Sequence, residues 1–279
     1  MGRKLLQACS IEVSDSKTTN EEVIRKAEEE ENRGLELVKE SSQSKRHKGN
    51  NKDEMIELPG IPLAPSVESS KSGVIFVLEK ASLTLAFVGR KFQILNPDEH
   101  GTFLRKKNMN PYDYRPDIVH EALCEIMDSR LRMAGKLKAI YIKTGEGILI
   151  KVEPNALIPR TLGRFCSMMA ELLQKLSIKA KGKGGKLLRL VENPVTQYLP
   201  VNSRKIGLSY SSKKAVELRD YVNAINHDED LVFVVGAMAH GKIDSDYTDD
   251  LISVSELPLS AGICLRRMRC AMERRWNIC

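Results

Sequence analysis

The apolar residues of this chain gather in short runs that have the length of β-strands. Residues 231–235 are apolar at every position, which predicts a strand buried on both faces and therefore central in a sheet. Residues 74–81 predict a similar first strand, while 139–143 and 148–152 predict a hairpin joined by a turn that contains glycine. Further strands are predicted at 187–191, 205–209 and 251–255.

Helical spacing of apolar residues alternates with these strands. Helices are predicted at about 118–127, 160–177 and 259–277. Pro159 sets the start of the second helix, and Ser260 is the predicted N-cap of the third. Residues 83–95 fit either extended structure or a short helix, and 97–101 are predicted to form a turn. Alternating strands and helices indicate an α/β domain.

The first 72 residues lack the pattern of a folded core. They contain an acidic block at 28–31, a long polar stretch and almost no aromatic residue, so residues 1–72 are predicted to be a disordered extension. The folded domain is therefore expected at 73–279. The basic cluster 45–48 is either a nuclear-import signal or one of the short basic clusters that are common in such tails.

Charge divides unevenly between these two parts. The chain has 44 Lys+Arg and 37 Asp+Glu; residues 1–72 hold 12 and 14, which leaves 32 and 23, a net charge of +9, for 73–279. A basic domain of this kind favours a polyanionic partner. No apolar run approaches the roughly 20 residues of a membrane span, and the N-terminus lacks a secretory signal. We therefore expect a soluble intracellular protein without a membrane partner.

Small residues follow the central strand and indicate a binding edge. Gly236 and Gly241 allow the backbone to pass close to a ligand where a Cβ atom would obstruct it. A second strand leads into the turn at 256–258 and then into the helix that Ser260 caps. In open α/β sheets, ligands bind outside the carboxyl ends of the strands, where helix N-termini are free. The six cysteines show neither C-x-x-C nor paired histidine spacing, so no metal site is expected.

Long motifs in this order carry a family resemblance. They are RPDIVHEAL at 115–123, IPRTLGRF at 158–165, KLLRLVENPV at 186–195, VVGAMAHGK at 234–242 and LPLSA at 257–261. With these motifs the chain resembles the eukaryotic and archaeal pseudouridine N1-methyltransferases of small-subunit ribosome biogenesis, over residues 73–279. The resemblance implies a SPOUT-type fold, a trefoil-knotted sheet with helices on both faces.

The resemblance also implies a cofactor, S-adenosyl-L-methionine, bound at the knot. The residues implied to bind it are Leu208, Gly236, Gly241, Val254, Ser255, Glu256, Leu257, Pro258 and Leu259. Members of the family commonly have a threonine where this chain has Leu208. If that contact is made by the backbone, leucine can replace threonine; if it is made by the hydroxyl, cofactor affinity should fall.

Arg115, Arg160 and Arg164 are the residues implied to bind RNA. Asp117 is implied either to orient Arg115 or to act as the catalytic base, although its position also suits a plain helix cap. Arg160 and Arg164 lie four residues apart near a helix start, where like charges repel and oppose the helix dipole. Either an RNA phosphate or simple solvation would compensate them. A third arginine that is common in the family is replaced here by Leu157.

The implied activity is methylation of N1 of a pseudouridine in small-subunit ribosomal RNA by a homodimer in the nucleolus or nucleus. Proteins of the small-subunit precursor particle are its expected partners, and no metal is required. The alternative is an RNA-binding assembly factor whose structural role matters more than methylation. A methyltransferase of transfer RNA fits the superfamily but not the RPDIVH and IPRTLGRF motifs.

Overall fold

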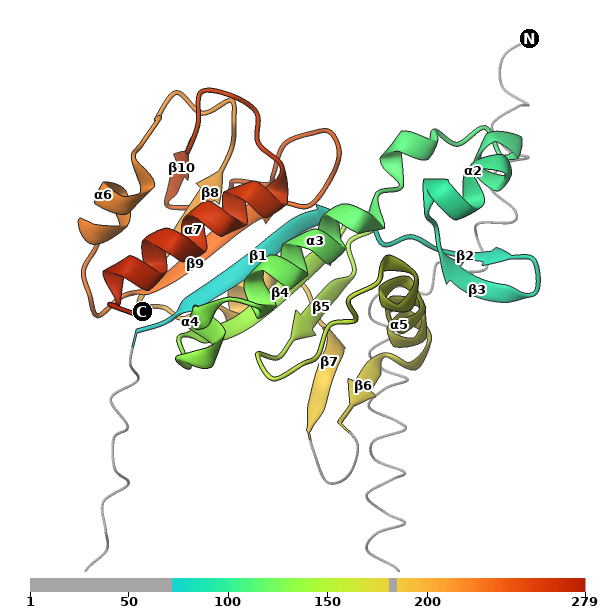
Figure 1. The fold of residues 1–279 in the computed structure, drawn as a ribbon, viewed down its shortest axis with the longest axis horizontal. Helices are drawn as coiled ribbons and strands as arrows, with labels where there is room; N and C mark the ends of the chain where they lie inside the picture. The colour runs from blue at the N-terminus through green and yellow to red at the C-terminus, as the bar shows by residue number, and fades with distance from the viewer. Residues whose placement is uncertain (1–71, 181–184, 279) are drawn as a thin grey trace, which may run out of the picture. The chain divides into compact units, whose positions relative to one another are not determined.

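A mixed eight-stranded sheet organises the chain. The computed structural model (Figure 1) describes residues 72–180 and 185–278, so nearly all of the predicted extension 1–72, and the basic cluster 45–48 with it, lies outside the described residues. The strands are β1 (Val74–Ala81), β4 (Leu137–Thr144), β5 (Leu149–Val152), β6 (Ser177–Lys179), β7 (Lys186–Val191), β8 (Ser203–Leu208), β9 (Asp230–Gly236) and β10 (Asp250–Ile252). Their order is β10-β8-β9-β1-β4-β5-β7-β6. Pairing is parallel from β10 to β4 and antiparallel from β4 to β6.

The prediction of a central strand at 231–235 is confirmed. β9 lies between β8 and β1, and β1 lies between β9 and β4. In this register Phe76 of β1 is paired with Phe233 and with Ile140, and the two phenylalanine rings stack with centroids 6.0 Å apart. Both faces of these strands are buried, because nearly every residue of β1 and β9 is inaccessible to solvent. The predicted hairpin is β4–β5, with Gly147 at φ +87° in its turn.

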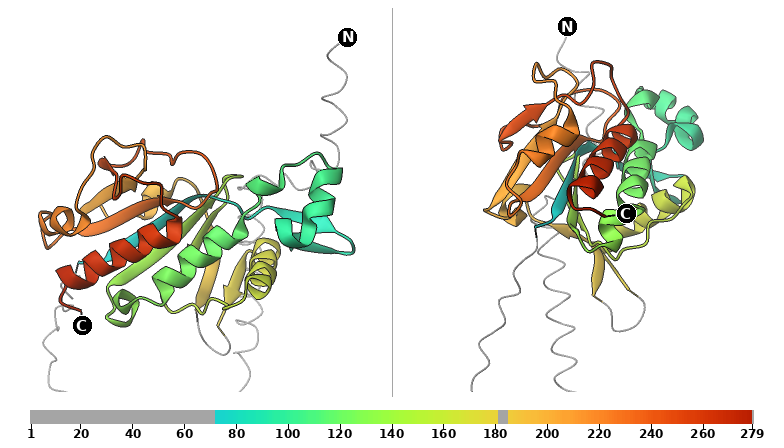
Figure 2. Two further views of the ribbon diagram at one scale, coloured as in Figure 1. Left: turned by 45° about the horizontal axis from the view of Figure 1, so that its top comes forward. Right: turned by 60° about the vertical axis from the view of Figure 1, so that its left-hand side comes forward.

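The α-helices that pack on this sheet share one of its faces. They are α3 (Pro116–Met127), α4 (Arg130–Met133), α5 (Leu162–Lys175), α6 (Leu218–Asn223) and α7 (Ala261–Arg275). Their apolar residues form one core with Val74, Phe76 and Leu78 of β1. Figures 1 and 2 show α3 and α7 side by side across β1 and β9.

The opposite face has a thinner cover. Ile75 and Val77 of β1 pack there with the 3₁₀ helix η3 (Val195–Tyr198) and with Ile243 and Tyr247 of the segment that follows β9. Helices on both faces were expected. Within the described ranges this holds only in a limited sense, since the second face has one 3₁₀ turn and no α-helix.

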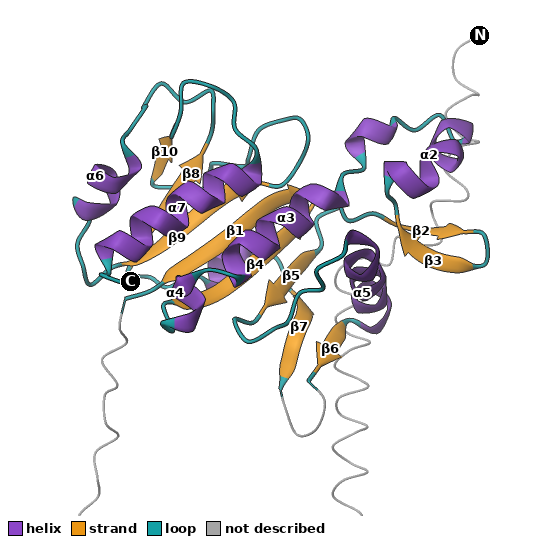
Figure 3. Ribbon diagram, viewed as in Figure 1, coloured by secondary structure: helices purple, strands orange, loops and turns teal. Residues whose placement is uncertain are grey.

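A small insertion follows β1 (Figure 3). The undecided segment 83–95 forms an antiparallel hairpin, β2 (Leu85–Val88) and β3 (Lys91–Ile94), with Gly89 at φ +69°. The predicted turn at 97–101 is wrong, because α2 (Pro97–Lys106) begins there. The Asn96 side chain accepts a hydrogen bond from the Asp98 N–H, and Pro97 occupies the first helical position, where its missing N–H has no cost.

The C-terminal strand passes through an earlier loop. On one edge β10 pairs with β8, and the Ser209 N–H donates to the Ile252 carbonyl (3.0 Å). On the other edge, the Ser253 N–H donates to the Lys214 carbonyl (2.8 Å), while the Val216 N–H donates to the Ser253 carbonyl (3.0 Å). The chain therefore runs between the two limbs of the loop that follows β8, and then enters α7. A knotted chain requires a crossing of this kind.

The predicted cap of the last helix is confirmed. Ser260 is the N-cap of α7, and its hydroxyl accepts a hydrogen bond from the Ile263 N–H (3.2 Å). Arg275 of this helix is buried, and its guanidinium donates to the carbonyl of Val222 in α6 and to those of Ile225 and Asn226 just after it. These bonds tie the C-terminal end of α7 to the end of α6. No helix in the described ranges is long and apolar enough to cross a membrane.

Candidate functional site

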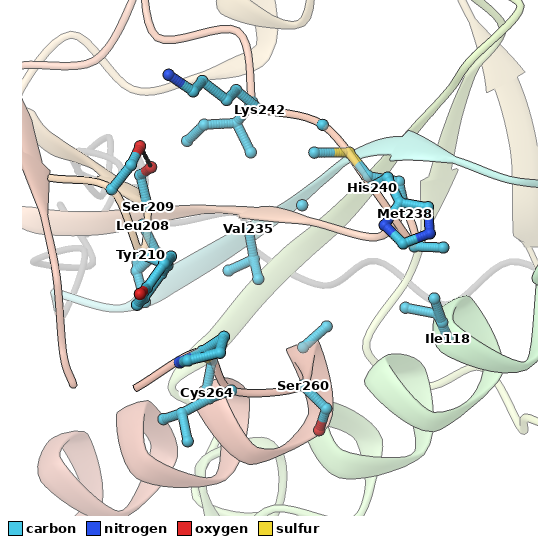
Figure 4. Close-up of a pocket in the computed structure, with 18 of the residues that line it drawn as sticks. Ile118, Leu208, Ser209, Tyr210, Val235, Met238, His240, Lys242, Ser260 and Cys264 are labelled. Atoms are coloured by element: carbon cyan, nitrogen blue, oxygen red, sulfur yellow. Dashed lines mark hydrogen bonds between the residues drawn. The ribbon is translucent and has the colours of Figure 1, made fainter. Parts of the chain in front are cut away.

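A cleft of about 820 Å³ opens where the carboxyl ends of β8, β9 and β10 meet the N-terminus of α7 (Figure 4). Every predicted cofactor residue except Glu256 lines it: Leu208, Gly236, Gly241, Val254, Ser255, Leu257, Pro258 and Leu259. Glu256 is exposed and does not line the cleft. The structure therefore brings together residues from three separate stretches of the chain at the sheet edge.

Glycine suits positions 236 and 241 for different physical reasons. A Cβ atom on Gly236 would lie 2.9 Å from the Met238 Cε atom and 3.3 Å from the Ile243 Cγ2 atom, so a side chain there would require the Met238 and Ile243 side chains of the segment after β9 to move. Gly241 has room, with only the Met238 Cε atom at 3.9 Å. Its φ of +116° is instead a conformation that residues with a Cβ atom rarely adopt.

The turn between β10 and α7 is held by side chains. The Ser253 hydroxyl donates to the Ser255 carbonyl (2.7 Å), and the Ser255 hydroxyl accepts from the Leu257 N–H (3.1 Å). Arg267 of α7 donates to the Val254 carbonyl (2.9 Å). These bonds fix the backbone of the turn before any ligand arrives, so ordering it costs a ligand little.

Leu208 lies at the end of β8 and is 8% exposed. Its side chain belongs to the core shared by the sheet and the helices, although the residue also lines the cleft. A leucine side chain gives a cofactor no hydroxyl. Contact through the backbone is therefore the alternative that fits, and it stays a prediction.

Arg115 and Asp117 form an ion pair at the mouth of the cleft. The Arg115 Nε donates to the Asp117 Oδ1 (2.8 Å) and the Arg115 NH2 to the Asp117 Oδ2 (2.7 Å). The helix-cap interpretation of Asp117 is wrong, because α3 begins one residue earlier with Arg115 at the N-cap position. Hydrogen bonding to Arg115 lowers the pKa of Asp117. Since a depressed pKa makes a carboxylate a poor base, the geometry favours the orienting role.

Arg160 and Arg164 lie outside the cleft. Arg160 forms a two-pronged ion pair with Asp128, the C-cap residue of α3, while Arg164 is exposed and has no ion pair with any described residue. Asp128 thus compensates the charge of Arg160 without RNA, while Arg164 is left to the solvent. Since the Arg160 side chain is 72% exposed, this ion pair contributes little stability and leaves the guanidinium open to exchange with a phosphate.

The cleft has further lining residues that the sequence reasoning did not name. They include Tyr112, Glu121, Ser209, Tyr210, Met238, His240, Lys242 and Cys264. His240 and Lys242 belong to the VVGAMAHGK motif, so their place in that motif was the available signal. Tyr112 had no such signal; the 3₁₀ turn η2 (Pro111–Asp113) places it beside Arg115, with 72% of the residue exposed. Among the described residues, no His, Cys, Asp and Glu side chains cluster as metal ligands.

A sheet with a cleft at its carboxyl edge, beside a strand that passes through a loop, defines the chain as a SPOUT-class, or α/β-knot, protein. A solved structure with this fold is Nep1 of Archaeoglobus fulgidus bound to S-adenosylhomocysteine, at a TM-score of 0.58 and 20% identity over 74% of this chain and 99% of that one.

Sequence comparison gives the family. Residues 76–273 match the model of the EMG1/NEP1 methyltransferase family. The ribosomal RNA small subunit methyltransferase NEP1 of Mus musculus is 42% identical over 74% of this chain and 82% of its own length. The corresponding Caenorhabditis elegans protein is 43% identical over 72% of this chain and 87% of its own. The chain belongs to the EMG1/NEP1 methyltransferase family.

Proposed function

We propose that this protein binds S-adenosylmethionine in the cleft and transfers its methyl group to N1 of a pseudouridine in small-subunit ribosomal RNA. One observation carries the proposal: eight of the nine residues implied for the cofactor line the same cleft as Arg115, which is implied to bind RNA, and Asp117, which is implied to orient it or to act as the base. The names of the mouse and nematode relatives give the same RNA class. The archaeal structure holds S-adenosylhomocysteine, which is what S-adenosylmethionine becomes after it loses its methyl group.

The reaction needs positioning more than it needs a strong catalytic group. The N1 lone pair attacks the methyl carbon, the carbon–sulfur bond breaks with its electrons going to sulfur, and the N1 proton leaves to solvent. Pseudouridine has this N1–H, whereas N1 of uridine is already bonded to the sugar. Holding the base and the sulfonium in line is the main contribution we assign to the cleft. The fixed turn at 253–257 and the segment after Gly236 form its cofactor side.

Arg115 is the residue we assign to the RNA side. Asp117 occupies two of the five N–H donors of its guanidinium, which leaves the others for a phosphate or for the anion that develops on the base. Asp117 acts by orienting Arg115. Tyr112, exposed beside this pair, suits stacking on an unpaired base, the usual mode of recognition in single-stranded RNA.

Arg160 and Arg164 suit a longer RNA track. Arg115 precedes α3 and Arg160 pairs with the residue that ends it. A helix of 12 residues rises about 18 Å, so these two arginines cannot meet at one phosphate. We assign them to phosphates several nucleotides apart. The net positive charge of the domain supports a nucleic-acid partner.

The proposed assembly is a homodimer that works on the small-subunit precursor particle in the nucleolus. Exposed apolar side chains near the cleft support an additional contact surface: Tyr210 is 61% exposed, Leu257 71% and Ile263 44%. Mass measurement of the purified chain in solution tests the dimer, and imaging of the tagged protein tests the compartment.

Methyl transfer to paired RNA hairpins tests the chemistry. The protein is incubated with S-adenosylmethionine labelled in the methyl group and with hairpins that carry either pseudouridine or uridine at one position of the same sequence. We expect label only in the pseudouridine hairpin, and the product should co-migrate with N1-methylpseudouridine after digestion. Equal labelling of both hairpins would contradict the choice of atom, and a protein that binds neither cofactor nor RNA would contradict the function itself.

A further inference from the structure

One wall of the cleft is a segment without hydrogen bonds or ion pairs to the described residues. Residues 238–243, which we call the cleft wall, all line the cleft between Gly236 and Asp244. Within the described part of the chain, none of them takes part in a hydrogen bond or an ion pair. The shape of the wall therefore depends on the packing of Ile243 and on what holds its two ends.

Both ends of the cleft wall are held by one residue, Glu79. At the first end the Ala237 N–H donates to the Glu79 carbonyl (2.8 Å). At the second end the Tyr247 hydroxyl donates to the Glu79 Oε1 atom (2.7 Å). Lys143 links the same two parts, since its Nζ lies 3.5 Å from the Glu79 Oε2 and 3.6 Å from the Asp244 Oδ2. Glu79 thus brackets the wall with its backbone and its side chain.

The position of Glu79 explains how it reaches both ends. It is paired with Gly236 across β1 and β9, so it lies directly beside the point where the chain leaves the sheet. Its side chain points to the same face of the sheet as Ile75 and Val77, where Ile243 and Tyr247 pack. The cleft does not include Glu79, Lys143 or Tyr247. The segment after β9 consequently straddles the sheet edge, with the cleft on one side and this network on the other.

The burial of the Glu79 carboxylate is unfavourable in free energy, so stability alone does not explain it. Its exposed fraction is 0%, and its Oε2 atom has only the ion pair with Lys143 and no hydrogen bond. Taking a carboxylate out of water is unfavourable, and buried ion pairs often contribute no net stability compared with apolar residues of similar size. A leucine at this position would suit the apolar strand β1 better. The network is therefore better explained by the geometry it imposes than by stability.

We propose that Glu79, with Tyr247 and Lys143, is a positioning residue that holds the cleft wall in the shape that accepts the cofactor, without touching the cofactor itself. This inference rests on the proposed function of the cleft. It predicts that loosening the network on the far face of the sheet weakens cofactor binding while it leaves RNA binding in place, because Arg115 and Asp117 belong to α3 and share no bond with the network.

Two matched tyrosine variants test it. Tyr247→Phe removes one hydroxyl that donates to Glu79, and Tyr221→Phe removes one hydroxyl that donates to Asp250 (2.6 Å), a carboxylate whose hydrogen bonds do not involve Glu79 or the cleft wall. Each loses a single hydrogen bond from a half-buried tyrosine to a carboxylate. The measurements are calorimetric binding of S-adenosylhomocysteine, RNA binding, melting temperature, and hydrogen exchange of peptides that cover 238–248.

We expect Tyr247→Phe to bind S-adenosylhomocysteine about tenfold more weakly, on the scale of one hydrogen bond to a charged group, and to exchange faster across the cleft wall. Tyr221→Phe should lose melting temperature but keep wild-type affinity. Glu79→Gln retains an acceptor for Tyr247 but not the charge, and its effect should not add to that of Tyr247→Phe, because the two residues share one network.

The outcomes separate the inference from the function it rests on. A wild-type protein that does not bind S-adenosylhomocysteine would contradict the proposed function. Equal affinity in the wild type and Tyr247→Phe, or an equal loss in both tyrosine variants, would overturn the positioning role while leaving the function intact. Loss of RNA binding in step with cofactor binding would also overturn it, since that result indicates general unfolding.

Discussion

Asp250 is the polar centre of the threaded strand, and replacing it by asparagine should destabilise the fold. Its carboxylate accepts hydrogen bonds from Arg204 of β8 (2.8 Å), from Lys214 of the loop that follows β8 (2.8 Å) and from Tyr221 of α6 (2.6 Å). These donors come from three segments that surround β10. Asp250→Asn keeps the shape of the side chain and one acceptor oxygen but removes the charge that all three donors favour.

The size of the effect follows from the exposure of the partners. Hydrogen bonds to charged groups contribute about 1.5–3 kcal/mol each when shielded from water. The Arg204 and Lys214 side chains are 43% and 50% exposed, so each ion pair is reduced to about 1 kcal/mol or less by solvent. The Tyr221 hydroxyl is better shielded. With one acceptor oxygen retained, we expect a loss of about 2 kcal/mol in the free energy of unfolding near pH 7.

The dependence on pH gives the sharper test. The three donors hold the pKa of Asp250 well below its ordinary value. A depressed folded-state pKa gives stability that is fully present above the unfolded value of about 3.9 and is lost as the pH falls toward the folded value. The difference between the wild type and Asp250→Asn should therefore be constant from pH 7 to about pH 4.5 and shrink below about pH 4.

Urea unfolding at several pH values measures this difference. Asp246→Asn serves as the control, since it removes the same charge from an exposed residue whose carboxylate has no bond to any described side chain. The reasoning would be refuted if both variants were equally stable at pH 7. A difference that stays constant down to pH 3 would show that Asp250 does not contribute through its charge.

Three further predictions concern the cleft and its rim. Gly241→Val should abolish binding of S-adenosylhomocysteine in a protein that still melts cooperatively, because a β-branched residue at φ +116° costs on the order of 1–3 kcal/mol and shifts the cleft wall; normal binding would contradict the placement of the pocket. Asp117→Asn should raise the KM for RNA and leave cofactor affinity unchanged, and a fall in kcat alone, largest near neutral pH and smaller at low pH where the wild-type carboxylate is itself protonated, would instead indicate a base. Arg115→Ala, Arg160→Ala and Arg164→Ala should each reduce the slope of RNA affinity against salt concentration by about one unit, whereas an unchanged slope would make that arginine a solvated surface residue.

The central strands and the binding edge were predictable because their signals are local. A strand that is apolar at every position has to be buried on both faces, so 231–235 could be placed at the centre of the sheet from the sequence alone. The glycines after it and the turn before α7 then fall at the carboxyl edge. The passage of the chain through its own loop could be predicted only from the family resemblance of the long motifs, because no periodicity of the sequence indicates it.

The errors arose where two local rules competed. Asp117 satisfies the sequence rule for an N-cap. In the structure, however, both of its carboxylate oxygens accept hydrogen bonds from Arg115, two residues before it, and the helix begins at Pro116. At 97–101 the prediction is a turn, although Asn96 followed by a proline is equally a helix start. Arg275 shows the same limit, since an arginine near a helix end is usually solvated, whereas this one is buried and donates to carbonyls just after α6. Only the tertiary fold decides between such alternatives.

Glu79 shows why the shape of the cleft could not be predicted from the residues that line it. A charged residue at the end of an apolar run is normally interpreted as the point where a strand reaches solvent, yet Glu79 is fully buried. Its partners, Tyr247 and Lys143, are far away in the sequence and lie on the face of the sheet opposite the α-helices. Because the cleft wall makes no hydrogen bond or ion pair with the described residues, its geometry is set by the contacts of Glu79, Tyr247 and Ile243 on that opposite face. The chemistry we assign to the cleft therefore depends on residues that sequence reasoning has no local reason to select.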